Sequence, residues 1–195
     1  MASDFGQKAP NSNRTLTGTG PETWTHDHTK TGVHDLCGNI WEVLAGLRIK
    51  NGVLMVAANN DAALPETDLT QCGDDWKLLT DDKGAPVYVS ASGSEIVFTT
   101  DNDEAGGLGS CEWGKVKTEC KSEMLKEYAL FSGEKEAYCC IDATEGEYIP
   151  IRGGYWSGGT SAGVFYLDLT YSRAGSRWSL GGRSAFFKKK QKAER

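Results

Sequence analysis

The chain of 195 residues has a mass of 21.1 kDa, which is the size of one ordinary domain. Acidic residues outnumber basic ones by 27 to 21, and the only basic run lies at 188–192, so the composition argues against a nucleic-acid-binding surface. The sequence contains no apolar run of about 18 residues and does not begin with a basic and then an apolar stretch, so we expect no membrane insertion and no signal peptide.

Glycine is unusually frequent, with 24 residues, and is accompanied by 6 Trp, 7 Tyr and only 5 Pro. This composition indicates short strands joined by long loops. The six cysteines form no C-x-x-C pair, and Cys139 and Cys140 are adjacent, so we expect mostly reduced thiols.

In chain order, residues 1–20 are rich in Ser, Thr, Asn and Gly without apolar periodicity, which predicts a flexible arm. In 44–56, apolar residues flank Asn51-Gly52, a dipeptide that favours a type I′ turn, and this predicts a β-hairpin. Residues 61–80 carry apolar side chains at spacings of three and four, which predicts a short helix.

Further along, 87–100 predicts two strands around the turn Ser92-Gly93-Ser94, and 101–110 predicts a loop. Residues 117–131 place Cys120, Met124, Leu125, Tyr128 and Phe131 on one helical face, which predicts the best helix of the chain. From 149 onward, glycine pairs alternate with short apolar runs, which predicts strands joined by Gly-rich loops.

Two clusters contain residue types that bind metals, but exposed loops are the simpler interpretation of both. His26-Asp27-His28 with His34 nearby offers imidazoles, and 101–104 offers an oxygen-rich acidic turn for Ca²⁺. Both are more typical of exposed loops, and no triad, P-loop or G-x-G-x-x-G pattern appears. We therefore expect no metal, no cofactor and no catalytic residue.

Two motifs carry more information: GVHDLCGNIWEV at 32–43 and IRGGYW at 151–156. They resemble the G-N-[VI]-W-E-W and R-G-G-x-W signatures of the C-type lectin fold, as used by formylglycine-generating enzymes and their relatives. The resemblance implies that Trp41 and Trp156 are core residues, each costing about 3–5 kcal/mol when truncated.

The segment 153–186 is similar to the C-terminal variable region of proteins encoded by diversity-generating retroelements, phage tropism determinants among them. In that family a fixed frame separates positions that are deliberately varied. The frame implied here includes Trp41, Gly153, Gly154, Trp156, Phe165, Trp178 and Arg183, and the resemblance implies that Trp156, Phe165, Trp178, Leu167 and Leu169 are buried.

Adenine mutagenesis of asparagine codons, the mechanism of that family, never yields Lys, Glu, Gln, Met or Trp. Lys, Glu, Gln and Met together number 34 in the chain, so about six are expected by proportion in 151–187, and none occurs there. This gap agrees with the resemblance, although a Gly-rich β segment also lacks such residues, and it makes Trp156 and Trp178 frame residues.

By analogy with the family, the varied positions form the ligand-binding site. They are Tyr155, Ser157, Gly158, Ser161, Tyr166, Asp168, Thr170, Tyr171, Gly175, Arg177 and Ser179. Tyr, Ser, Gly and Arg are the residues that binding loops favour, and we expect Tyr155, Tyr166, Tyr171 and Arg177 to be the anchors. Tyr to Ala changes are expected to abolish binding while leaving the melting temperature nearly unchanged.

The resemblance thus implies an α+β protein of the C-type lectin fold, with short twisted antiparallel strands, one or two helices and long loops. We expect a flexible arm at 1–20, a lectin-like domain at 21–187 with its variable region at 153–186, and a basic tail at 188–195.

The expected function is recognition of a host or cell-surface protein or glycan by a diversified surface, without catalysis. The expected location is a phage tail or a cell surface, and a homo-oligomer is compatible with such display. One alternative is a fixed-specificity lectin-like binder, although the E-P-N and Q-P-D tripeptides of calcium-dependent sugar binding are missing. The other is an oxidase like the formylglycine-generating enzymes, whose paired C-terminal cysteines have no counterpart beyond Cys140.

Overall fold

In the computed structural model, residues 6–11, 15–131, 137–159 and 162–183 are described. Strands dominate them, with three 3₁₀ turns and one short α-helix. The strands are β1 (Trp41–Val43), β2 (Leu47–Lys50), β3 (Val53–Ala57), β4 (Trp76–Leu78), β5 (Tyr88–Ser92), β6 (Glu95–Thr99), β7 (Leu108–Glu112), β8 (Lys117–Thr118), β9 (Tyr138–Asp142), β10 (Glu147–Gly153), β11 (Gly163–Ser172) and β12 (Leu180–Gly181). The helical turns are η1 (Glu22–Trp24), η2 (Ala58–Ala63), η3 (Trp113–Lys115) and α1 (Glu123–Glu127).

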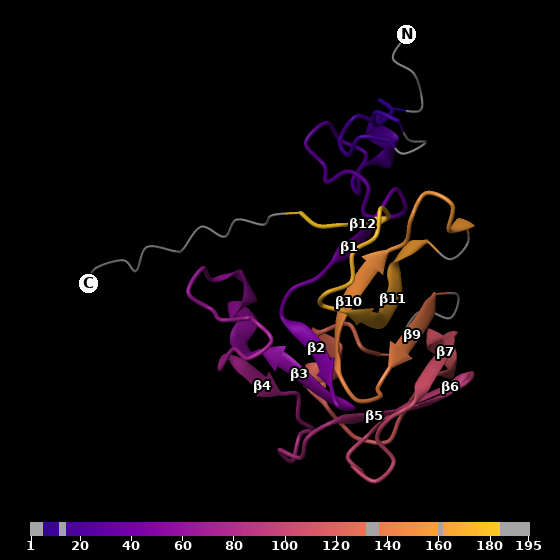
Figure 1. Cartoon of the computed structure of the whole chain (residues 1–195). Helices are drawn as coiled ribbons and strands as arrows, with labels where there is room; N and C mark the ends of the chain where they lie inside the picture. The colour runs from indigo at the N-terminus through magenta and orange to yellow at the C-terminus, as the bar shows by residue number, and fades with distance from the viewer. Residues whose placement is uncertain (1–5, 12–14, 132–136, 160–161, 184–195) are drawn as a thin grey trace.

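All twelve strands belong to one mixed sheet, whose main path runs β7-β9-β11-β10-β2-β3-β5-β6-β8. The sheet curls around a common interior, as Figure 1 shows, and its β7 end comes back to the hairpin of β5 and β6. The contact is made by bridges from Ser90 to Gly106 and from Gly93 to Gly109, which join β5 and its turn to the β7 segment. These bridges pair backbone groups that an open edge would leave exposed.

The core fills the interior of this curled sheet. Ile49, Leu54, Phe98, Ile141 and Leu167 are fully buried there and come from β2, β3, β6, β9 and β11. Because side chains alternate across each strand, the other face of the same strands is left for solvent or for a ligand.

Two hairpins predicted from the sequence are confirmed. Strands β2 and β3 pair in antiparallel register across Asn51 and Gly52, and both turn residues have the positive φ angles, 49° and 80°, that a type I′ turn requires. Strands β5 and β6 pair across the turn at Gly93, as expected for 87–100.

The expected α+β C-type lectin fold is wrong. The described residues form one twelve-stranded mixed sheet with no α-helix longer than the five residues of α1. Three of its strand pairings are parallel, β11 with β9, β6 with β8 and β1 with β12. The family resemblance therefore does not extend to the architecture.

The helix predicted for 61–80 is replaced by turns that lead into β4. Asp68 accepts a hydrogen bond from the backbone N–H of Thr70, and Asp75 accepts one from the N–H of Asp68. Such side-chain contacts compete with helical hydrogen bonds. Trp76 then pairs with Ala57 of β3, so its burial comes from sheet pairing.

The helix predicted for 117–131 shrinks to α1. Lys117 and Thr118 pair with β6 instead, and Ser122 caps the first turn by accepting a hydrogen bond from the N–H of Leu125. Ala129, with a φ of 53°, stops the helix. The loop expected at 101–110 is also shorter, because β7 begins at Leu108.

The N-terminal segment lies beside β1 and β12, away from the curled sheet (Figure 1). Its described part carries a bridge between Lys8 and Thr15, and the predicted tail at 188–195 lies outside the described residues. None of the described helices has the length and apolar character needed to cross a membrane. None of the six cysteines, all of which lie among the described residues, forms a disulfide in this structure.

Candidate ligand-binding surface

Strand β11 divides its residues between the core and the outside. Leu167 and Leu169 are buried in the core, as expected, so the alternating side chains of Tyr166, Asp168 and Thr170 lie on the outer face. Three predicted binding residues are therefore presented side by side by one strand.

The outer face of β11 continues over β9 and β7. Asp168 is in register with Cys140, and Cys140 with Ser110. The Cys140 Sγ lies 3.0 Å from Ser110 Oγ and 3.5 Å from the hydroxyl of Tyr166. A hollow of about 530 Å³ opens here, lined among others by Asp142, Asp168 and Thr170.

Six aromatic side chains form a continuous row across this end of the molecule. The aromatic row consists of Trp156, Trp178, Tyr155, Trp41, Tyr166 and Tyr138. Successive ring centroids are 6.4, 6.1, 6.3, 5.0 and 6.3 Å apart. These distances lie within the range of favourable aromatic pairs.

The buried Trp41 at the centre of the row supports its exposed ends. It stacks on Tyr155 and meets Tyr166 edge-on, and its backbone N–H donates to the carbonyl of Ser179 at 2.8 Å. Trp41 thus joins residues from β1, the β10–β11 loop and β11, and its predicted burial is confirmed.

Three frame residues expected in the core are instead exposed. Trp156 has 49% of its surface exposed, Trp178 has 55% and Phe165 has 47%. The expectation was wrong because both tryptophans stand in turns that project from the sheet, and Phe165 lies near the start of β11, before its core-facing residues begin. These large apolar side chains are available for contact with a partner.

Ser179 is the reverse case. It was predicted as an exposed, varied position, but only 8% of its surface is exposed. Two contacts with Trp41 keep Ser179 buried. The neighbouring Leu180 pairs with Trp41, and the carbonyl of Ser179 accepts a hydrogen bond from the backbone N–H of Trp41.

The remaining predicted positions lie in the loops around the row. Ser157 is exposed and Gly158 half-buried in the turn after β10, and Gly175 is exposed in the turn after β11. The guanidinium of Arg177 lies 4.8 Å from the ring centroid of Tyr171, in a cation–π contact. Ser161 lies outside the described residues.

Burial alters the acidity of the groups on this surface. Desolvation raises the pKa of the Asp168 carboxyl, although its hydrogen bonds from Thr170 act in the opposite direction. Burial likewise raises the pKa of the Tyr166 and Tyr171 hydroxyls. Both tyrosines therefore stay neutral hydrogen-bonding groups near pH 7.

Two glycines and Arg183, all predicted as frame residues, hold the loops in place. Gly153 has a φ of 92°, and a Cβ there would stand 2.9 Å from the carbonyl oxygen of Leu36, while Gly154 is buried with a φ of 79°. Arg183 pairs with Glu42 and donates to the carbonyl oxygen of His34 at 2.9 Å.

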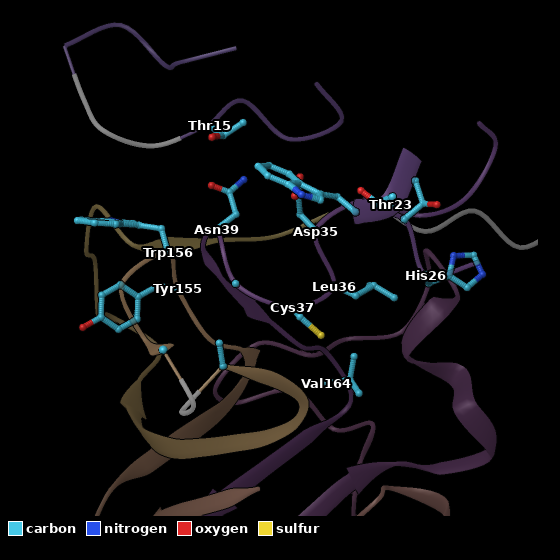
Figure 2. Close-up of a pocket in the computed structure, with 15 residues that line it drawn as sticks. Thr15, Thr23, His26, Asp35, Leu36, Cys37, Asn39, Tyr155, Trp156 and Val164 are labelled. Atoms are coloured by element: carbon cyan, nitrogen blue, oxygen red, sulfur yellow. The ribbon is translucent and has the colours of Figure 1, made fainter. Parts of the chain in front are cut away.

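A deeper cavity of about 680 Å³ adjoins one end of the aromatic row. Figure 2 shows Tyr155 and Trp156 on one side of it and Thr23 and His26 of the N-terminal segment on the other. Trp24 also lines the cavity. Asp35 and Asn39 lie between the two sides.

Sequence reasoning missed most of this cavity. Asn39 belongs to the G-N-[VI]-W motif, and His26 belongs to the histidine cluster that offers imidazole ligands. Trp24 gave no signal, because it lies in a polar stretch without periodicity.

Comparisons with protein-family models and with curated proteins give no match for this sequence.

Proposed function

We propose that this chain is a ligand-binding protein whose surface along the aromatic row and β11 is diversified by a retroelement, and that it recognises a receptor on a host cell, as a phage-tail or cell-surface component. The surface binds and does not catalyse. The observation that carries the proposal is the gathering of predicted varied positions from three segments, 155–158, 166–171 and 175–177, around one aromatic row with exposed ends.

The chemistry of this surface favours a macromolecular partner. Exposed Trp156, Trp178 and Phe165 supply large apolar contact area, and interfaces are anchored by such aromatic residues and by Arg. Trp156 and Trp178 lie together, with their ring centroids 6.4 Å apart, and exposed apolar patches mark interaction sites on folded proteins.

The division of labour between fixed and varied residues also supports the proposal. Trp156 and Trp178 cannot arise by adenine mutagenesis of asparagine codons, so they act as constant anchors. Tyr155 and Tyr166, which contact the buried Trp41, are positions where exchange changes the shape and hydrogen bonding between those anchors. Because β11 is paired within the sheet, its backbone is expected to stay unchanged when these side chains are exchanged.

The structure revises one expectation about the anchors. Tyr155 and Tyr166 are half-buried against Trp41, so their truncation to Ala is expected to lower stability as well as binding. Arg177 is exposed, so Arg177→Ala is the cleaner probe of partner binding, with stability kept within about 0.5 kcal/mol.

The test is codon-by-codon sequencing of this gene across many sister genomes. We expect substitutions concentrated at the exposed predicted positions, with Trp156, Trp178, Gly153 and Gly154 unchanged. Variation spread evenly along the chain, or no variation at all, would contradict the proposal and indicate a binder of fixed specificity.

A further inference from the structure

We propose that the cavity of about 680 Å³ beside the aromatic row binds a neutral monosaccharide ring, such as the terminal sugar of a glycan. The inference names a ligand class for a pocket of largely fixed residues. It rests on the proposed function only in taking that glycan to belong to the receptor.

Hydrogen bonds connect both sides of the cavity to the segment 35–39 between them. On one side, the backbone N–H of Trp156 donates to the carbonyl of Asn39 at 3.0 Å, and that of Gly38 to the carbonyl of Gly153 at 2.8 Å. On the other side, the N–H of Asp35 donates to the carbonyl of Trp24 at 3.2 Å, and the Asp35 carboxylate accepts from the N–H of Gly18 at 3.2 Å. Its volume lies within the range of about 300–1,000 Å³ that small-molecule sites occupy.

The lining combines flat aromatic surfaces with hydrogen-bonding groups. Trp24, Tyr155 and Trp156 contribute rings. Asp35, Asn39 and Thr23 contribute a carboxylate, an amide and a hydroxyl (Figure 2). A pyranose has the matching character, because its C–H groups form an apolar face and its hydroxyls project around the edge. An extended apolar ligand would leave these polar groups unpaired at a cost of about 1–3 kcal/mol each.

One polar atom in the lining lacks a partner. The Oδ1 of Asn39 is buried without a hydrogen bond among the described residues, while its Nδ2 donates to Thr17 at 3.3 Å. An acceptor in this state is costly, and a sugar hydroxyl seated beside Asn39, with a small turn of the amide, supplies the missing donor.

The charge of the lining selects a neutral sugar. Asp35 is its one acidic residue, and neither Lys nor Arg is among the described residues that surround the cavity. An anionic sugar such as glucuronic acid would place two carboxylates close together in a partly enclosed site, which is unfavourable.

The test is saturation-transfer difference NMR on the full chain with free glucose, galactose, mannose, fucose, N-acetylglucosamine and glucuronic acid. We expect saturation of the ring C–H protons of at least one neutral sugar, and weaker binding of glucuronic acid than of glucose. The absence of binding by every neutral sugar in this set would overturn the inference.

Paired variants locate the binding. Trp24→Ala is expected to weaken binding about tenfold, and Trp24→Phe, which keeps a ring, to restore most of it. Phe131→Ala removes an aromatic ring that is 45% exposed and does not line the cavity, and it is expected to change sugar affinity less than twofold. Equal losses in Trp24→Ala and Phe131→Ala would contradict the assignment to this cavity.

Two further variants keep the test valid if Trp24→Ala folds poorly. Asn39 has a φ of 59° and Asp35 a φ of 57°, conformations that Gly and Asn adopt readily. Asn39→Gly removes the amide and is expected to weaken sugar binding severalfold. Asp35→Asn is expected to raise the affinity for glucuronic acid relative to glucose, and an unchanged ratio would argue against Asp35 as the selecting charge.

These outcomes separate the inference from the proposed function. Sugar binding that depends on Trp24, in a gene without clustered variation, would support the cavity assignment and contradict the proposal of a diversified surface. Clustered variation at the predicted positions without binding of any neutral sugar would support the diversified surface and contradict the cavity assignment.

Discussion

The guanidinium of Arg173 donates two hydrogen bonds to the buried carboxylate of Glu147, from Nε to Oε2 at 2.9 Å and from Nη2 to Oε1 at 3.0 Å. Arg48 approaches the same carboxylate from the other side, with Nη1 at 2.8 Å from Oε1. The three residues connect β2, β10 and the end of β11, so one carboxylate holds the strand that carries the proposed binding residues against the sheet.

Replacing this carboxylate is expected to be strongly destabilising. Glu147→Gln leaves Arg48, whose side chain is only 3% exposed, without a countercharge, and breaking a buried ion pair costs about 3–5 kcal/mol. Urea unfolding followed by circular dichroism measures the change. The matched control is Glu95→Gln, which removes a surface pair with Lys117 whose side chains are 55% and 61% exposed and should cost no more than about 1 kcal/mol. Equal losses in the two variants would contradict a special role for Glu147.

The same carboxylate makes stability depend on pH on the acid side. Hydrogen bonds from Arg173 and Arg48 hold the pKa of Glu147 below its ordinary value of 4.5. Its stabilising contribution is therefore complete above pH 4.5 and disappears as the pH falls from there through the lower pKa of the folded state.

Wild-type protein should accordingly lose more unfolding free energy than Glu147→Gln between about pH 6 and pH 3. Unfolding curves recorded at several pH values give both slopes. Parallel pH profiles would mean that Glu147 titrates normally in the folded protein.

Gly153 offers a third test, this time of backbone conformation. A Cβ at this position meets the carbonyl oxygen of Leu36 at 2.9 Å, and the φ of 92° is itself strained for an L residue. Gly153→Ala is expected to lower stability by about 1–3 kcal/mol. At Gly163, its partner in the β10–β11 pairing, an added methyl group would have no neighbour within 4 Å, so Gly163→Ala should be close to neutral in the same melting experiment.

The sequence was most informative where structure is decided locally. Asn51-Gly52 specifies a turn by its own backbone preferences, and the alternation in 166–169 specifies that Leu167 and Leu169 of β11 face inward. Both predictions needed only neighbouring residues, and both are confirmed.

The sequence was least informative where pairing over long distances decides the outcome. Trp76 and Lys117 stand in helical patterns, yet each pairs with a strand far away in the sequence, β3 or β6. The tryptophans of the frame were misjudged for a related reason. Side-chain size favours burial on average, but Trp156 and Trp178 lie in turns outside the strands, where 49% and 55% of their surfaces stay exposed.

The cavity was missed because it brings together residues from 15–39 and 155–164. Asn39 and Trp156 are far apart in the sequence, and their contact is a backbone hydrogen bond, which leaves no trace in residue type.

Ser179 distinguishes a varied surface position from a buried one. It is 8% exposed, whereas Ser157 is exposed in the turn after β10. Ser179→Tyr forces a large ring into a packed site and is expected to cost about 1–3 kcal/mol, while Ser157→Tyr should stay within about 0.5 kcal/mol. Thermal melting of the two variants, which introduce the same side chain, makes the comparison direct. If Ser179→Tyr melts with the wild type, position 179 tolerates diversification after all, and the varied surface extends past Trp178 to the edge of β12.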